Sequence, residues 1–360
     1  MNSKRMHIQL SFDLTEEKKS GVPLLSNALI ELLDAVKTTG SISSAAKKLG
    51  FSYRHLWNEI NDWEAQLGQP LFLRGRGKSG ELTEYALRLL WANKEVQAKY
   101  REQLADLQAG ISLAFQKALA ERWTSILIEG CADLALNLLR ENSLEAKNPI
   151  EINFTSSQEG LKSLAQGKCD LAGFNFPAGS GRNSEAFRVF YPFLDEGNEL
   201  LIQFASRVQG LIVAKGNPKS LYSLIDVAEK KASFLNRREG TGTRILLDEL
   251  LRTAGLMPKE IKGYTNISES QSLTAVQVAC GKADVGISTA NVAKEYGLDF
   301  IPLAKEVYFL AGKKDFISSK EGEEFLEFLK HFNWSSYTDD LPGYSFEDIG
   351  KVIHISDAFR

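Results

Sequence analysis

The chain has 360 residues, of which 43% are hydrophobic and 25% charged, a composition that is ordinary for a soluble globular protein. A chain of this length exceeds what a single hydrophobic core usually contains, so we expect more than one domain. Three widely spaced cysteines indicate neither a disulfide framework nor a zinc motif, and no apolar stretch suits a signal peptide or a membrane span, so we expect a cytoplasmic protein. The formal net charge of −3 divides unevenly: residues 1–120 have 16 Lys and Arg against 13 Asp and Glu, and the rest has 27 against 33. This asymmetry favours a nucleic-acid-binding head on an acidic body.

Two apolar patterns precede residue 40. Residues 7–14 alternate weakly between polar and apolar side chains, which predicts an edge strand. Between residues 23 and 39 the apolar positions recur at helical spacing, which predicts a helix with one buried face formed by Leu25, Leu29, Ile30, Leu33 and Val36.

Residues 40–82 contain two short helical patterns separated by only three residues. The two sets of apolar positions are Ile42, Ala45, Ala46 and Leu49, and then Leu56, Ile60, Trp63 and Leu67. Gly50 can adopt the left-handed conformation that ends a helix, and Ser52 can accept from the free amides that begin the next one. Spacing and caps together predict a helix-turn-helix.

The second of these helices and the loop after it offer groups for DNA. A recognition helix enters the major groove with its N-terminal end first, so polar side chains there suit base edges and phosphates. Short strands at residues 71–73 and 81–82 flank a loop with three cations and no acid, which we interpret as a basic wing. The candidate DNA-binding residues are Ser43, Ser52, Tyr53, Arg54, His55, Asn58, Arg74, Arg76 and Lys78. The alternative is that this polar face is only the solvated side of an all-helical core.

Several motifs follow one another in this region: Gly40-Ser41-Ile42, Ala45-Ala46, Gly50, Ser52-Tyr53-Arg54, Trp57, Leu67-Gly-x-Pro-Leu-Phe and Leu82-Thr83. In this combination they resemble the winged helix-turn-helix of molybdate-responsive repressors and their LysR-type relatives, over residues 22–118. The resemblance implies a DNA-binding transcriptional regulator. One departure is the loop at residues 74–80, which is shorter and less glycine-rich than in the molybdate-responsive members.

Residues 83–120 are predicted to form one long helix. Its apolar positions are spaced by sevens, fours and threes: Leu89, Val96, Tyr100, Leu104, Leu107, Ile111, Ala114 and Ala118. Such a stripe needs a partner, which is either its own domain or a second copy of the chain. Regulators of this type bind paired half-sites, so we predict a homodimer through this helix.

From residue 122 onward, short apolar runs alternate with helical patterns, which predicts an α/β body with mostly parallel sheets. The predicted strands are residues 125–128, 150–154, 170–174, 200–204, 210–214, 232–235, 283–287 and 299–303. We therefore expect three segments: a winged helix-turn-helix DNA-binding domain at 1–83, a linker and dimerisation helix at 84–120, and a ligand-sensing domain at 121–360.

A second set of motifs spans most of residues 122–345, including Ser156-Ser157-x-x-Gly-Leu161, Gly167-x-x-Asp-Leu-Ala172, Asn236-Arg-x-x-Gly-Thr-Gly-Thr-Arg244, Gly281-x-Ala-Asp-Val-Gly286 and Leu341-Pro-Gly-Tyr344. These motifs are similar to the periplasmic-binding-protein superfamily, in particular to its cytoplasmic domains fused to helix-turn-helix heads or to molybdopterin-biosynthesis proteins. The resemblance implies an α+β multidomain chain with a two-lobed α/β (type 2) domain, a cleft between its lobes, and crossing strands at residues 200–214 and 283–288. Ser270-Gln271 stands where relatives often have Thr-His, so we expect altered ligand contacts there.

Three strand-to-helix junctions provide candidate ligand-binding groups. At residues 240–244 a glycine-rich turn opens a helix and offers free amides and a partial positive charge to an anion, and residues 155–158 and 129–133 are placed in the same way. The candidate ligand-binding residues are Cys131, Ser156, Ser157, Thr241, Gly242, Thr243, Arg244 and Gln271. Each junction could instead be a capped helix without a ligand, and Arg244 could pair with Asp248 one turn later.

Hydroxyl and amide donors around a glycine-rich turn favour a small oxyanion, and both resemblances point to molybdate or tungstate. A molybdopterin derivative or another organic effector stays open, with Phe174, Phe176 and Tyr191 as pocket residues. The four histidines lie far apart and no nucleophile elbow is present, so we expect no catalysis, no metal site and no required cofactor. The prediction is a homodimeric transcriptional regulator that binds double-stranded DNA and a small anion, and no membrane. The alternative is a ligand-binding or storage protein whose head contacts only proteins.

Overall fold

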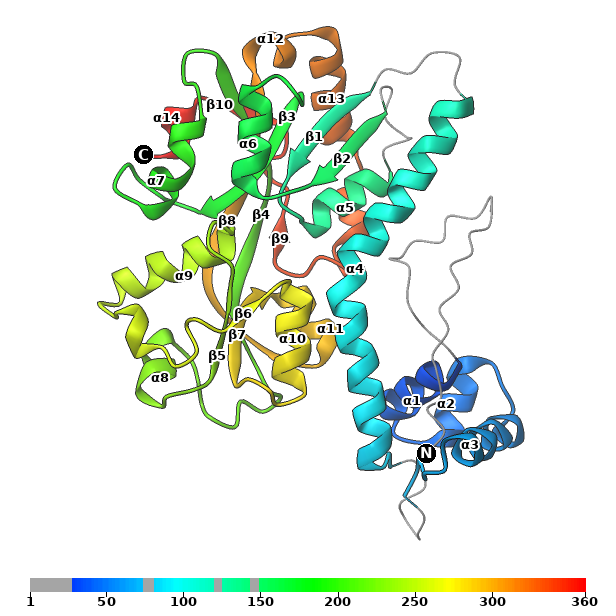
Figure 1. Ribbon diagram of the computed structural model, residues 1–360. Helices are drawn as coiled ribbons and strands as arrows, with labels where there is room; N and C mark the ends of the chain where they lie inside the picture. Colours follow the sequence, from blue (N-terminus) through cyan, green and yellow to red (C-terminus); the bar gives the residue numbers. More distant parts are fainter. Residues whose placement is uncertain (1–27, 74–80, 120–124, 143–148) are drawn as a thin grey trace.

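The N-terminal head has three helices in the computed structural model, which describes residues 28–73, 81–119, 125–142 and 149–360 (Figure 1). These helices are α1 (Ala28–Thr39), α2 (Ile42–Leu49) and α3 (Tyr53–Leu67). Gly50 has a φ of 74° and ends α2, and the Ser52 hydroxyl accepts from His55 N at 3.1 Å and caps α3. The predicted helix-turn-helix is confirmed, with the turn that the sequence indicates.

Two short segments after α3 pair with each other. Phe72 and Leu82 form an isolated antiparallel bridge, and Leu73 N donates to Glu81 O at 2.9 Å. This pairing is the stem of the predicted wing. The loop at residues 74–80 and the edge strand predicted at residues 7–14 lie outside the described residues.

One long helix, α4 (Glu84–Leu119), joins the head to the body (Figure 1). Its first turns contribute the fully buried Ala86 and Leu90 to the core of the head. Further along, Ala98 packs against Leu273 and Val276 of the body. The long helix expected from residues 83–120 is therefore present, and its first turns and its middle contact different parts of the chain.

The described part of the body has a ten-stranded sheet in the order β2-β1-β3-β8-β4-β7-β5-β6, with β9 and β10 paired to β4. Lobe I contains β1 (Ile126–Gly130), α5 (Leu134–Glu141), β2 (Ile150–Phe154), α6 (Ser157–Ala165), β3 (Leu171–Pro177) and α7 (Glu185–Phe190). The C-terminal elements return to it: α12 (Lys314–Ile317), α13 (Lys320–His331), β9 (Tyr344–Ser345), β10 (Lys351–Ile353) and α14 (Ile355–Ala358). Lobe II contains α8 (Leu224–Glu229), β5 (Phe234–Arg237), α9 (Gly242–Thr253), β6 (Ile267–Ser268), α10 (Gln271–Ala279), β7 (Val285–Thr289) and α11 (Ala290–Tyr296).

Two 15-residue strands, β4 (Glu199–Val213) and β8 (Asp299–Lys313), pair antiparallel along their length and cross between the lobes (Figure 1). In lobe I, β8 pairs with β3, and in lobe II, β4 pairs with β7. The crossing predicted at residues 200–214 is confirmed. The second prediction was wrong: residues 283–288 belong largely to β7 within lobe II, and β8 is the other crossing strand.

Three further strand predictions need correction. Residues 200–204 and 210–214 belong to one strand, because the polar residues between them, Ser206, Arg207 and Gln209, are buried and paired instead of forming a turn. The strand predicted at residues 299–303 extends to Lys313, past the charged Lys305 and Glu306. The sheet is mixed instead of mostly parallel, because both crossing strands pair antiparallel with each other and with β3 and β7.

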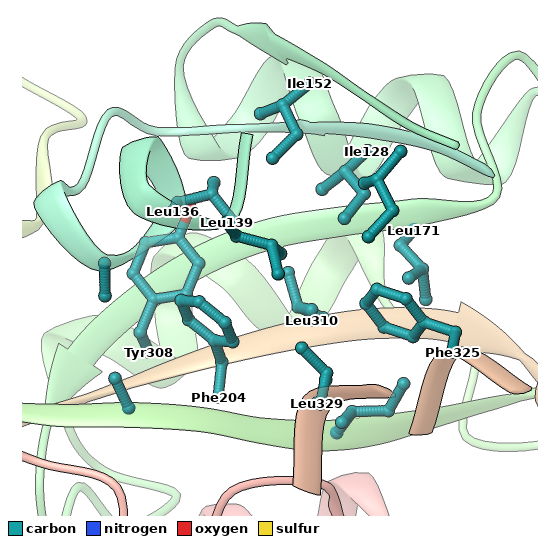
Figure 2. Close-up of a cluster of buried hydrophobic side chains, with 14 of the residues drawn as sticks. Ile128, Leu136, Leu139, Ile152, Leu171, Phe204, Tyr308, Leu310, Phe325 and Leu329 are labelled. Atoms are coloured by element: carbon teal, nitrogen blue, oxygen red, sulfur yellow. The ribbon is translucent and has the colours of Figure 1, made fainter. Parts of the chain in front are cut away.

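Figure 2 shows the hydrophobic core of lobe I, where Leu136 and Leu139 of α5 pack against buried side chains of the sheet. Tyr308 lies in this core, and its hydroxyl donates to the Cys131 carbonyl at 2.7 Å. A Cβ at Gly173 would lie 2.4 Å from that hydroxyl, so glycine is required where β3 passes Tyr308. The packing fixes the turn between β1 and α5. None of the helices in the described residues is long and apolar enough to cross a membrane.

Candidate functional site

The head presents an exposed polar face at the start of α3. The exposed residues among the DNA-binding candidates are Ser43, Ser52, Tyr53, Arg54, His55 and Asn58. The first turn of α3 contains no acid, and Arg54 has no ion-pair partner among the described residues. Its guanidinium is therefore available to a phosphate or a base edge. The other candidates, Arg74, Arg76 and Lys78, lie outside the described residues.

In lobe I the two predicted junctions lie together, because Thr155 N donates to Gly130 O at 2.9 Å. Ser156 caps α6: its hydroxyl accepts from Glu159 N at 3.2 Å and donates to Glu159 Oε2 at 3.0 Å. The Ser156 hydroxyl therefore forms its hydrogen bonds within α6, as expected if this junction is a capped helix without a ligand.

Ser157, the first residue of α6, differs from its neighbour. Its side chain is 1% exposed, and its hydroxyl lies near the Cys131 thiol without the geometry of a hydrogen bond. Ser157 therefore keeps a buried hydroxyl that the fold does not use.

In lobe II, α9 begins at the predicted glycine-rich turn. The Thr241 hydroxyl donates to Arg238 O at 2.8 Å and accepts from Arg244 N at 3.4 Å, so it caps the helix. Arg244 is buried, its Nε donates to the Asp248 carboxylate at 3.0 and 3.2 Å, and its guanidinium lies over the Tyr264 ring. The pair with Asp248, left open by the sequence, is formed.

Gln271 links three elements of lobe II. It is the first residue of α10, and its Nε2 donates to Thr243 Oγ1 at 3.4 Å. Its Oε1 accepts from Ser288 Oγ at 3.2 Å and Thr289 Oγ1 at 3.4 Å, both at the end of β7. The structure thus brings together Thr243 and Gln271, two of the predicted ligand-binding residues.

The two lobes touch where Asn175 of β3 meets Gly242 of α9. A Cβ at Gly242 would lie 2.3 Å from Asn175 Nδ2, so a larger residue would prevent this approach. Asn175 is 2% exposed; its Oδ1 accepts from Cys131 Sγ at 3.0 Å, and its Nδ2 has no hydrogen-bond partner. Burial raises the pKa of Cys131, so the thiol stays protonated and holds the amide in this orientation. A second contact joins the lobes where Glu185 N donates to Glu249 Oε2 at 3.2 Å.

A buried cluster of charged and polar side chains, the hinge cluster, lies where β4 and β8 cross between the lobes. Its members are Asp133, Arg207, Gln209, Glu306 and Tyr344. Arg207 hydrogen-bonds the Asp133 carboxylate and reaches Glu306 Oε2 through Nε at 3.2 Å. Gln209 Nε2 donates to the same Glu306 oxygen at 3.0 Å, and Tyr344 donates to Asp133 at 3.0 Å. Burial alone lowers the pKa of Arg207, but Tyr344, Asp133 and Glu306 outweigh it and raise the pKa, so the guanidinium stays charged.

We define the interlobe site as the contact between Asn175 and Gly242, together with Ser157 of lobe I and Thr243 and Gln271 of lobe II. Ser157 and Asn175 offer two buried donors. In α9 the amides of Gly242 and Thr243 precede the first amide that the helix cap bonds, that of Arg244. These groups gather several hydrogen-bond donors around one contact between the lobes. No group of three His, Cys, Asp or Glu side chains in the described ranges could hold a metal ion.

The sequence did not identify Asn175 or the hinge cluster. A signal was present, because Asn175, Arg207, Gln209 and Glu306 are polar residues inside strands that are otherwise apolar. Buried polar side chains of this kind need partners, which made them candidates for a site.

In this fold a helix-turn-helix head is joined by α4 to a two-lobed α/β domain. Residues 28–87 match the bacterial regulatory helix-turn-helix protein of the lysR family, and residues 141–330 match the PBP superfamily domain. Because the second match covers more than half of the chain, the chain belongs to the PBP superfamily, and its head matches the lysR-family helix-turn-helix.

Individual proteins are similar to the chain over part or most of its length. The chain is 30% identical over 250 residues to the uncharacterized protein YvgK of Bacillus subtilis, covering 66% of this chain and 76% of YvgK. It is 31% identical over 106 residues to the molybdenum transport protein ModE of Azotobacter vinelandii, covering 26% of this chain and 39% of ModE. A mutant OxyR of Corynebacterium glutamicum with bound hydrogen peroxide is similar with a TM-score of 0.44 at 16% identity, covering 84% of this chain and 90% of that chain.

Proposed function

We propose that this chain is a DNA-binding transcriptional regulator that senses a small oxyanion at the interlobe site, and that molybdate and tungstate are the anions to which it responds. The observation that supports this most directly is a pair of buried donors without partners, the Ser157 hydroxyl and the Asn175 amide nitrogen. A buried polar group left without a hydrogen bond costs about 1 to 3 kcal/mol. An oxyanion that accepts from both groups removes that cost.

The first turn of α9 lies opposite these donors. Its free amides and the positive end of the helix dipole favour an anion, and Gly242 lets the backbone come close. Thr243 and Gln271 add a hydroxyl and an amide, and Cys131 orients Asn175. We assign a supporting role to three other candidates, whose side chains bond within their own segments: Ser156, Thr241 and Arg244.

The choice of molybdate and tungstate among tetrahedral anions rests on similarity. ModE of Azotobacter vinelandii is named as a molybdenum transport protein, and this chain is 31% identical to it over 106 residues. The donors of the interlobe site are neutral, which suits an anion bound through hydrogen bonds instead of through a countercharge.

We infer that α4 transmits the state of the interlobe site to the head. Three ion pairs of 2.6 to 2.7 Å tie α4 to both lobes, two in lobe II and one in lobe I: Arg101–Glu295, Lys282–Glu95 and Arg140–Asp106. Ser270 caps α10 directly before Gln271, and its hydroxyl donates to Ala98 O of α4 at 3.2 Å. A change in the angle between the lobes therefore alters contacts of α4, and the ligand can shift this equilibrium only by its differential affinity for the two states.

In this proposal the three segments 1–83, 84–120 and 121–360 bind DNA, dimerise and sense the anion, respectively. Val96, Tyr100 and Leu107 of α4 are 40–49% exposed although apolar, which suits a second copy of the chain packed along this helix. Two heads in a symmetric dimer would place two α3 helices on paired half-sites of DNA.

A thermal-shift series of the full chain against molybdate, tungstate, sulfate and phosphate tests the proposal. Binding to the folded state raises the melting temperature by mass action, so we expect a rise with molybdate and tungstate. Thr243→Val should abolish the rise with little loss of stability, whereas Thr253→Val, at the exposed end of the same helix, should leave it unchanged. If none of the four anions raises the melting temperature, the effector is an organic molecule and the oxyanion proposal fails.

A further inference from the structure

Two acceptor oxygens of the hinge cluster have no donor. Glu306 and Gln209 are 0% exposed, and the Oε1 atom of each lacks a hydrogen-bond partner. The other carboxylate oxygen of Glu306 accepts from both Arg207 and Gln209. A buried carboxylate that uses one oxygen fully can accept a further hydrogen bond at the other oxygen.

Glu306 and Asn175 lie on the same face of the sheet. In the pairing of β3 with β8, Asn175 lies opposite Tyr308, and Glu306 is two residues further along β8. Asn175 and Glu306 are therefore diagonal neighbours on one face of the sheet, a separation that long side chains and a small ligand between them can span. Glu306 also lies where β8 leaves lobe I, next to the contact between the lobes.

The charges around this place are unbalanced. Two carboxylates, Asp133 and Glu306, share one guanidinium, that of Arg207. The other titratable groups that face the cluster are Tyr344, Tyr308 and Cys131, and burial raises the pKa of each, so they stay uncharged. A dianion bound to Asn175 would add two negative charges. It would also place its own oxygens, which accept hydrogen bonds, beside Glu306 Oε1, which is an acceptor too. Two acceptors can meet there only with a proton between them.

We propose that an oxyanion binding at the interlobe site takes up one proton from solvent, shared between an oxygen of the anion and Oε1 of Glu306; this rests on the proposed oxyanion function. One O–H bond forms, on the carboxyl group or on the anion, and no bond of the anion breaks. Molybdate and tungstate have no proton near neutral pH, so the uptake is one proton per anion bound. Their affinity should then fall about tenfold for each unit of rising pH.

Titration calorimetry of the full chain with sodium molybdate and sodium tungstate, in buffers of different ionisation enthalpy at one near-neutral pH, counts these protons. The observed enthalpy should rise with the buffer's ionisation enthalpy at a slope of about one proton per anion. Glu306→Gln supplies an N–H donor of its own, so it should retain binding while the slope falls to zero. Glu199→Gln is the matched control, because Glu199 is another buried carboxylate of lobe I, with one oxygen accepting from Asp195 N.

The outcomes separate the two proposals. Binding of molybdate to the natural chain without proton uptake, or an unchanged slope in Glu306→Gln, overturns the role of Glu306 and leaves the oxyanion sensor intact. Failure of molybdate and tungstate to bind at all removes both proposals. If Glu306→Gln does not fold, the slope and the pH dependence of the natural chain decide, since both are measured without a variant.

Discussion

A single methyl group at position 242 should hold the two lobes apart. The Cβ of Gly242→Ala would lie 2.3 Å from Asn175 Nδ2 and 2.9 Å from its Cγ and Oδ1. The amide is not free to rotate away, because its Oδ1 accepts from Cys131 Sγ. Overpacking of this kind costs about 1 to 3 kcal/mol. Alanine suits the first position of α9 at least as well as glycine, so the cost falls on the contact between the lobes and not on the helix.

If the anion binds to the closed lobes, Gly242→Ala should weaken its affinity by the same free energy, about five- to 150-fold. Titration calorimetry with molybdate measures this loss. Gly110→Ala is the matched control, since nothing lies within 4 Å of its added Cβ. In a double-mutant cycle on thermal stability, Asn175→Ala should relieve part of the cost of Gly242→Ala. If Gly242→Ala binds molybdate with unchanged affinity, the lobes do not close on Asn175 when the anion binds.

Three further predictions concern the head, the long helix and the hinge cluster. Arg54→Ala should weaken DNA binding, measured by fluorescence anisotropy, by about 1 to 3 kcal/mol. Arg188→Ala, which changes an exposed arginine of lobe I, should leave DNA binding unchanged. If both variants bind DNA equally well, Arg54 is not part of the DNA interface. Leu107→Asp changes an apolar residue of α4 that is 49% exposed, and it should give a monomeric mass in light scattering. Val352→Asp, the control, should keep the mass of a dimer. If both variants are dimers, the dimer interface does not include Leu107. Arg207→Met should lower the free energy of unfolding in urea by about 3 to 5 kcal/mol, because it leaves two buried carboxylates without their ion-pair partner. A loss below about 1 kcal/mol would show that the ion pairs of Arg207 are not needed for stability.

The head could be predicted from the sequence because its information is local. The helical spacing of Ile42 to Leu49 and of Leu56 to Leu67 defines two helices, and the turn between them needs only the left-handed Gly50 and the cap of Ser52. Each feature involves residues within a few positions of one another. The same holds for α4, whose length follows from an unbroken apolar period.

The crossing strands could not be predicted in full, because their polar residues find partners far away in the sequence. Arg207 and Glu306 interrupt two apolar runs, which is typical of a turn in a sequence viewed alone. In the fold they pair with each other and with Asp133, so the strand continues through them. Antiparallel pairing of two strands about 100 residues apart likewise leaves no local pattern.

The sequence predicted the helix-start residues of the interlobe site but not Asn175. The glycine-rich turn before α9 and the serines before α6 were found from helix-start chemistry, and they do lie at helix starts. That chemistry cannot distinguish a hydroxyl that caps its helix, such as Ser156, from one left unused, such as Ser157. Asn175 depends on where β3 lies relative to α9, which only tertiary packing determines.

One measurement tests both the DNA binding of this chain and its control by an oxyanion. Double-stranded DNA selected by the full chain from a random pool is labelled, and its affinity is measured by fluorescence anisotropy with and without molybdate. We expect a selected site with two related half-sites and an affinity that molybdate changes in the natural chain but not in Thr243→Val. Selection of no defined site, or an affinity that molybdate, tungstate, sulfate and phosphate all leave unchanged, would contradict it.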